Sequence, residues 1–133
     1  MNVVYIATDS YFSLLGISVN SIIMNQKNGE ETKFFICSPD LREEHKIQIK
    51  NFVVMFNAEV YFIDISDYLE HFKGEINTSG FHPIVLARLF LESYLPDTID
   101  KVLYLDCDVI ANGNIWKLEK EKLEGKAFAA VPE

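Results

Sequence analysis

Three apolar runs of the kind that forms buried strands recur along this chain, with helix-like segments between them. They occupy residues 3–7, 33–37 and 59–63, and they are rich in β-branched and aromatic side chains. Continuous apolar runs of this length are typical of parallel strands covered on both faces. Strands that alternate with helices predict a parallel α/β sheet with right-handed crossovers. The 133 residues suffice for one domain with a real core, so we expect a single domain over 1–133.

The segments between these runs carry the start and stop signals of helices. A helix is expected over residues 11–26, opened by the cap-forming residues 8–10, and it is apolar around much of its circumference and therefore well buried. A second helix is expected to begin at residues 38–40, and a third to run over 83–94 after an initial proline. The buried stripe of the second helix is expected to be Ile49, Phe52, Val53 and Phe56.

Beyond the third strand the pattern weakens. A helical turn is expected over 67–70, a mobile loop over 73–80 and a partly helical segment over 115–123. Residues 126–131, which contain the apolar letters AFAAV, predict a final strand.

A fourth short apolar run, residues 102–105, ends abruptly in Asp106, Cys107 and Asp108. In a strand, alternate residues point to the same side about 7 Å apart, so the two carboxylates share one side and Cys107 faces the other. Oxygen-only ligands favour a hard divalent cation, Mn²⁺ or Mg²⁺. Acids that follow a strand are also common turn residues, and for this pair alone both interpretations stay open.

Polar clusters follow two of the expected strands, at residues 8–10 and 106–108. Ligands on open parallel sheets bind beyond the carboxyl ends of strands, where the strand order reverses. If the two strands flank that point, both clusters border one crevice. The glycine fingerprint of dinucleotide-binding proteins does not follow the first strand, and the chain contains no P-loop, so neither a nicotinamide enzyme nor a P-loop ATPase is indicated.

The formal net charge of −8 argues against nucleic acid or an anionic membrane surface as a partner. An anionic ligand such as a nucleotide would therefore need a metal or a local basic group. Two cysteines, Cys37 and Cys107, do not make a disulfide framework. With no basic leader and no membrane-spanning apolar stretch, the expected location is the cytoplasm, and peripheral attachment to the inner face of the membrane through residues outside this chain stays open. His45 lies among charged residues and is expected to be solvated.

Three blocks together resemble glycosyltransferase family 8, which includes bacterial lipopolysaccharide galactosyl- and glucosyltransferases and glycogenin. The blocks are VVYIATDSYFSLLGISVNSII at residues 3–23, PIVLARLFLESYLP at 83–96 and KVLYLDCDVIANGNI at 101–115. Their order and spacing match the family over nearly the whole chain. The resemblance implies a GT-A fold, which is a Rossmann-like domain for nucleotide sugars, and hexosyl transfer from a UDP-hexose to a saccharide or glycolipid acceptor with retention of the anomeric configuration.

The same resemblance implies roles for particular residues. Asp106 and Asp108 would ligate Mn²⁺ or Mg²⁺ at the UDP diphosphate, and Asp106 would also touch the ribose or sugar. Tyr11 would stack on the uracil, although a core role is its alternative. Arg88 would reach the donor sugar or diphosphate, although it could instead pair with Glu92 one turn on. The whole donor-binding set is Ala7, Thr8, Asp9, Tyr11, Arg88, Asp106, Cys107 and Asp108.

Enzymes of this family are considerably longer than 133 residues and take a third metal ligand, normally a histidine, from their second half. The chain is therefore expected to be the donor-binding, N-terminal half of such an enzyme, inactive alone and prone to self-association through its uncovered last strand. Two alternatives remain at this point. One is a non-catalytic nucleotide-binding or assembly module. The other is a phosphatase of the haloacid-dehalogenase type, which also carries an Asp-X-Asp motif after an apolar strand.

Overall fold

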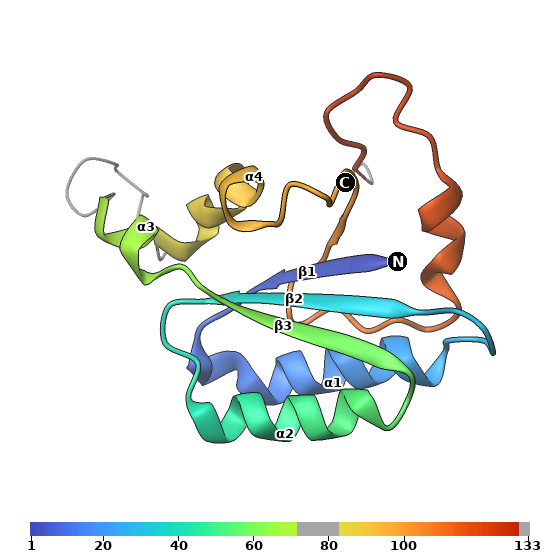
Figure 1. Cartoon of the computed structure of the whole chain (residues 1–133), viewed down its shortest axis with the longest axis horizontal. Coiled ribbons are helices and arrows are strands. Elements are labelled where there is room, and N and C mark those ends of the chain that lie inside the picture. The colour runs from blue at the N-terminus through green and yellow to red at the C-terminus, as the bar shows by residue number, and fades with distance from the viewer. Residues whose placement is uncertain (72–82, 131–133) are drawn as a thin grey trace.

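The computed structural model describes residues 1–71 and 83–130 of the chain. These residues form a four-stranded, fully parallel sheet with the order β3-β2-β1-β4 (Figure 1). The predicted parallel α/β sheet is therefore confirmed. Its strands are β1 (Asn2–Ile6), β2 (Thr32–Ser38), β3 (Ala58–Asp64) and β4 (Leu103–Tyr104).

The strand order reverses between β1 and β4. From β1 the chain adds β2 and then β3 on one side, and only afterwards places β4 on the other side of β1. Val3 pairs with Leu103 and Val4 with Tyr104. The backbone N–H of Leu105 then donates to the carbonyl of Val4 at 3.0 Å, which extends the ladder toward the carboxyl ends. The two strands that carry polar clusters are thus direct neighbours, as the crevice hypothesis requires.

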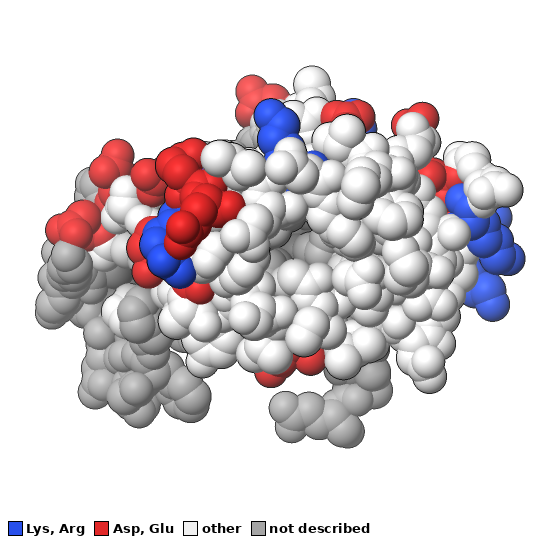
Figure 2. Space-filling view, turned by 90° about the horizontal axis from the view of Figure 1, so that it is seen from below, with Lys and Arg blue, Asp and Glu red and all other residues white. Residues whose placement is uncertain are grey.

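Helices α1 (Phe12–Met24) and α2 (Glu43–Val54) cover one face of the sheet (Figure 1). Helix α1 is less buried than predicted, because Ile17 and Met24 of its apolar circumference are 50% and 55% exposed, so the helix buries one face only. Seen from this side, the surface is largely uncharged at its centre, with acidic and basic groups toward its edges (Figure 2). The core beneath is formed mainly by Val3, Tyr5, Leu15, Val19, Ile22, Phe34, Ile36, Ile49 and Val53.

The opposite face is covered by α3 (Ser66–His71), the 3₁₀ helix η2 (Pro83–Phe90) and α4 (Leu91–Tyr94). The predicted helix over 83–94 is thus mostly 3₁₀. Ile84 and Ala87 both pack against the core of this face, and a spacing of three residues aligns side chains along a 3₁₀ helix. The helical turn expected over 67–70 is confirmed as part of α3, and the loop expected over 73–80 lies outside the described residues.

Two predicted boundaries are wrong. The second helix begins at Glu43 instead of residues 38–40, because Ser38 still pairs with Asp64 in the sheet and Arg42 occupies the cap position.

The final strand predicted over 126–131 is not formed in its described part, where Phe128 is 79% exposed and no neighbouring strand pairs with the run. The expected self-association stays a prediction, and it would rest on exposed apolar side chains such as Phe128 and not on an uncovered strand. The partly helical segment over 115–123 is confirmed as the 3₁₀ helix η3 (Ile115–Lys120). Within the described ranges, no helix is both long and apolar enough to cross a membrane.

Candidate functional site

The acid pair lies just beyond the end of β4, in a tight turn. Since β4 ends at Tyr104, Asp106 and Asp108 are not strand residues as the spacing suggested, and the N–H of Val109 closes the turn by donating to the carbonyl of Asp106 at 3.1 Å. Both carboxylates are on exposed residues. Cys107 faces the other way and packs against the core under α1 and α2, where burial raises the pKa of its thiol. The predicted opposition of Cys107 to Asp106 is confirmed.

Asp106 is held by two side chains from the opposite face of the sheet. The phenol of Tyr104 donates to Oδ1 of Asp106 at 2.8 Å, and Nη2 of Arg88 lies 3.7 Å from the same oxygen. The Arg88 guanidinium sits over the Tyr104 ring, with Cζ 5.1 Å from the ring centroid. Burial, reinforced by the hydrogen bond to Asp106, raises the pKa of Tyr104 above its usual range. Arg88 therefore faces the acid pair and not Glu92, the alternative partner suggested by sequence.

The donor atoms at this turn suit a hard cation, though they are few. Asp106 and Asp108 offer only carboxylate oxygens, which Mn²⁺ and Mg²⁺ prefer. No group of three or more His, Cys, Asp or Glu side chains that could hold a metal occurs in the described part of the chain. A cation here would take two carboxylate ligands from these residues, and the other positions would be filled by a ligand, water or further protein groups.

The second polar cluster, at the end of β1, is tied to the start of α2 through the carboxylate of Asp9. Its Oδ1 accepts from the Arg42 backbone N–H at 3.0 Å and from Nδ1 of His45 at 2.7 Å. Its Oδ2 accepts from Nε of Arg42 at 2.7 Å. Together these donors, the Arg42 backbone N–H first, lower the pKa of Asp9 to about 2. The prediction that His45 is solvated is wrong, because its side chain is only 12% exposed.

Tyr11 is presented to solvent at the same turn. It ends the 3₁₀ helix η1 (Asp9–Tyr11), whose first turn is closed by the Tyr11 N–H donating to the Thr8 carbonyl at 3.0 Å. The Thr8 side chain makes no capping hydrogen bond and lies 2.7 Å from the Ser10 hydroxyl instead. Tyr11 is 51% exposed, which excludes the alternative that it is a core residue.

The model of glycosyl transferase family 8 matches residues 2–133. The chain belongs to this family. A probable galacturonosyltransferase-like protein of Arabidopsis thaliana is 26% identical over 114 residues, which are 85% of this chain and 32% of that protein. A putative glycosyltransferase of Haemophilus influenzae is 28% identical over 120 residues, 89% of this chain and 34% of that protein. This chain thus spans about a third of the length of these curated relatives.

Solved structures agree with the family 8 assignment. The galactosyltransferase LgtC, crystallised with donor and acceptor sugar analogs, superposes with a TM-score of 0.78 at 27% identity, over 92% of this chain and 43% of that one. The bifunctional glycosyltransferase WbbM matches with a TM-score of 0.75 at 21% identity, over 92% of this chain and 21% of that one, and shares the fold. The GT-A fold expected from the sequence is therefore confirmed. The family membership also removes the phosphatase alternative.

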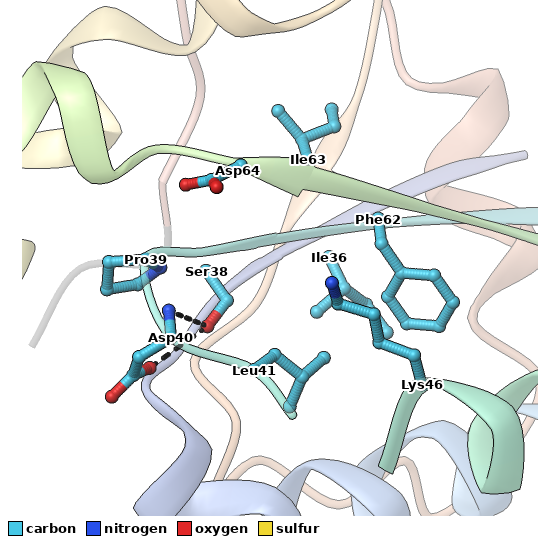
Figure 3. Close-up of a pocket in the computed structure, with 9 residues that line it drawn as sticks. All are labelled: Ile36, Ser38, Pro39, Asp40, Leu41, Lys46, Phe62, Ile63 and Asp64. Atoms are coloured by element: carbon cyan, nitrogen blue, oxygen red, sulfur yellow. Dashed lines mark hydrogen bonds between the residues drawn. The ribbon is translucent and has the colours of Figure 1, made fainter. Parts of the chain in front are cut away.

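A polar pocket of about 120 Å³ lies at the carboxyl ends of β2 and β3 (Figure 3). Asp40 of this pocket also holds the turn after β1, because its Oδ1 accepts from the backbone N–H of Asp9 at 2.9 Å and from the Ser38 hydroxyl at 3.3 Å. None of the predicted site residues lines it. Its walls are formed by Ile36, Ser38, Pro39, Asp40, Leu41, Lys46, Phe62, Ile63 and Asp64.

The residues that support the candidate site were not predicted from the sequence. Tyr104 holds Asp106, while Asp40, Arg42 and His45 hold the Asp9 turn. Two signals were available. Tyr104 stands two residues before Asp106, a spacing that places two side chains on the same side of an extended segment, and residues 40–45 follow the end of β2, the strand that pairs with β1.

Proposed function

We propose that this chain binds a UDP-hexose in the crevice beyond β1 and β4, and that the protein transfers the hexosyl group to a saccharide or glycolipid acceptor of the lipopolysaccharide type. The observation that carries the proposal is the adjacency of β1 and β4 at the reversal of strand order, because it brings the Thr8–Tyr11 turn and the acid pair to one edge. Membership of glycosyltransferase family 8 supports a sugar transfer, and the galactosyltransferase LgtC is a related example.

In this proposal the ends of β1 and β4 bind different parts of the donor. At the β1 end, Ala7, Thr8 and Asp9 border the uridine, and the exposed ring of Tyr11 stacks on the uracil. At the β4 end, Asp106 and Asp108 hold Mn²⁺ or Mg²⁺, and Cys107 anchors the turn between them in the core. Arg88, already beside Asp106, faces the donor sugar or diphosphate, where a planar guanidinium suits anionic oxygens.

The metal, when bound, would offset the negative charge that grows on the departing UDP. The protein side chains orient the donor around it. Arg88 supplies a local positive charge in a chain whose net charge is −8, and that charge favours the approach of an anionic ligand. We also infer a cytoplasmic location, because Cys37 and Cys107 are free thiols, as is usual in a reducing compartment.

The test is calorimetric titration of UDP with and without Mn²⁺, on the wild type and on Asp108→Ala. Metal and nucleotide should each strengthen the binding of the other by the same factor in the wild type, because the two equilibria are linked. Asp108→Ala should lose most of that coupling. Asp97→Ala, which removes one exposed carboxylate from the loop before β4, is the matched control and should retain it. Equal UDP affinities in every titration would contradict the proposal.

A second candidate is a nucleotide-binding module that performs no transfer. It is favoured by the finding that the described residues bring together no group of three or more His, Cys, Asp or Glu side chains for a metal. Release of UDP from UDP-galactose and UDP-glucose, measured with and without a saccharide acceptor, separates the two functions. Coupled binding of UDP and Mn²⁺ without release of UDP from either sugar would favour the module.

A further inference from the structure

The turn that connects β1 to α1 both accepts hydrogen bonds from the β2–α2 region and donates one to it. The Asp9 carboxylate reaches across to Arg42 and His45, while its backbone N–H donates back to the carboxylate of Asp40. Both Asp9 oxygens are occupied by these donors, and its side chain is only 16% exposed. The carboxylate is therefore engaged by the protein itself and is poorly placed to accept a hydrogen bond from a ligand.

The hydrogen bonds of His45 assign its tautomer. A guanidinium can only donate, so the contact of 3.1 Å between Nη2 of Arg42 and Nε2 of His45 makes Nε2 the acceptor. The proton then lies on Nδ1, which donates to Oδ1 of Asp9 at 2.7 Å. Arg42, His45 and Asp9 thus form a closed ring of hydrogen bonds, with each group in a fixed role.

His45 also holds the residue on the other side of Tyr11. Its imidazole stacks on Phe12 with the ring centroids 3.7 Å apart and the planes 2° from parallel. Phe12 begins α1 and packs against the core. One side chain from α2 therefore fixes Asp9 through a hydrogen bond and Phe12 through stacking, and these two residues bracket Tyr11. The backbone around an exposed aromatic ring is held from both sides.

We propose that Asp9, Arg42 and His45 form a latch that positions the Thr8–Tyr11 turn for the nucleotide before the nucleotide arrives. The inference rests on the proposed function and refines it: Asp9 is a positioning residue that acts through the turn, and its carboxylate does not contact the ligand. Pre-organisation of this kind strengthens binding by removing the entropy cost of ordering the turn on association.

The experiment compares Asp9→Asn, His45→Asn, His45→Phe and Glu44→Gln with the wild type. His45→Asn keeps an N–H near the Nδ1 position, whereas His45→Phe keeps the stacking on Phe12 and loses the hydrogen bond. Glu44→Gln removes the other ion-pair partner of Arg42, at 2.7 Å, and a carboxylate 3.9 Å from Nε2 of His45, while it leaves the hydrogen bonds among Asp9, Arg42 and His45 in place. It is the control for the loss of a nearby charge. Thermal unfolding of each variant verifies that it folds.

Three readouts are needed. Calorimetry measures the UDP affinity in the presence of Mn²⁺, amide hydrogen exchange of Tyr11 and Arg42 without nucleotide measures the order of the turn, and ¹⁵N shifts of the His45 ring measure its tautomer. We expect Asp9→Asn and His45→Phe to weaken UDP binding about tenfold, as expected for loss of a charge-assisted hydrogen bond. In both variants the amide hydrogen of Tyr11 should exchange faster than in the wild type. His45→Asn should recover part of the affinity, and Glu44→Gln should match the wild type.

The outcomes separate the latch from the proposed function. A wild type that does not bind UDP overturns the nucleotide site and the positioning role with it. If the wild type binds UDP, and the variants show faster amide exchange at Tyr11 but an unchanged UDP affinity, the latch alone is overturned. Weaker UDP binding by Asp9→Asn with unchanged amide exchange at Tyr11 would show that Asp9 contacts the ligand directly. That result also overturns the latch. A His45 ring protonated on Nε2 would contradict the hydrogen-bonded ring itself.

Discussion

Tyr104 donates its phenol hydrogen to Oδ1 of Asp106 across 2.8 Å, so the last residue of β4 holds the first acid of the pair. The ring packs against the core on the side of η2 and α4, which limits how far the hydroxyl can move. In the described part of the chain nothing donates a hydrogen bond to Oδ2 of Asp106. One carboxylate oxygen is therefore fixed by Tyr104, and the other is left without a donor among the described residues.

Tyr104→Phe should weaken Mn²⁺ binding about three- to tenfold, because Asp106 loses the donor that orients it, a loss of about 1 kcal/mol. Electron paramagnetic resonance of free Mn²⁺ measures the affinity. Tyr94→Phe is the matched control, since Tyr94 belongs to the same cluster and its buried hydroxyl has no hydrogen-bond partner among the described residues. Equal losses in both variants would show that Tyr104 acts only through the fold.

Arg88→Gln should change metal and nucleotide binding in opposite directions. Its positive charge lies 3.7 Å from Asp106 and competes with a cation, so Mn²⁺ alone should bind slightly more tightly in the variant. UDP should bind about three- to tenfold more weakly, because a charge that attracts the diphosphate is lost. Lys50→Gln, an equal charge change on the exposed side of α2, controls for net charge. Parallel changes for both ligands would count against a site role for Arg88.

Tyr11→Ala should weaken UDP binding by about 1–3 kcal/mol, the usual contribution of base–aromatic stacking. Because the side chain is 51% exposed, the free energy of unfolding should change little. Calorimetry and urea unfolding measure the two quantities on the same protein. A large loss of stability with unchanged UDP affinity would instead give Tyr11 a structural role.

Two neighbouring leucines of α1 test the packing of the core. Leu15→Ala should lower the free energy of unfolding by about 3 kcal/mol, because the side chain is 1% exposed and leaves a cavity. Leu14→Ala should cost less than about 1 kcal/mol, because Leu14 is 41% exposed. Urea unfolding of both variants gives the difference, and similar losses would contradict the orientation of α1.

Asp9 makes stability depend on acid pH. Its pKa is lowered from 3.8 to about 2 in the folded protein, so its stabilising contribution is fully present above pH 3.8. That contribution is lost as the pH falls through about 2. Between these limits the wild type should therefore lose stability more steeply than Asp9→Asn. Urea unfolding at a series of pH values measures both slopes, and equal slopes would show that the carboxylate is not held as described.

The sheet was predictable because its strands are continuous apolar runs, and the structure places the two strands that end in polar clusters side by side, as the sequence hypothesis requires. The details that failed depend on neighbours far away in sequence. Residues 127–130 have the composition of a strand but no partner strand, and Ser38 looks like a helix cap but pairs with Asp64. The charged sequence neighbours of His45 are typical of a surface residue, but in the structure α2 places its side chain against Asp9 and Phe12. Hydrophobic periodicity indicates which side of an element is buried, but it does not indicate which element packs against that side.

The shortness of β4 has a consequence for metal binding. Leu103 and Tyr104 pair only with β1 among the described strands, at the edge of the sheet, so few backbone hydrogen bonds hold the segment that leads to the acid pair. Such edges open locally at a lower free energy than the rest of a domain. A cation that binds only the closed form has its apparent affinity reduced by the fraction of molecules that are open, and it protects the strand in return. Metal titration should therefore slow amide exchange at Leu105 before it changes the global melting temperature.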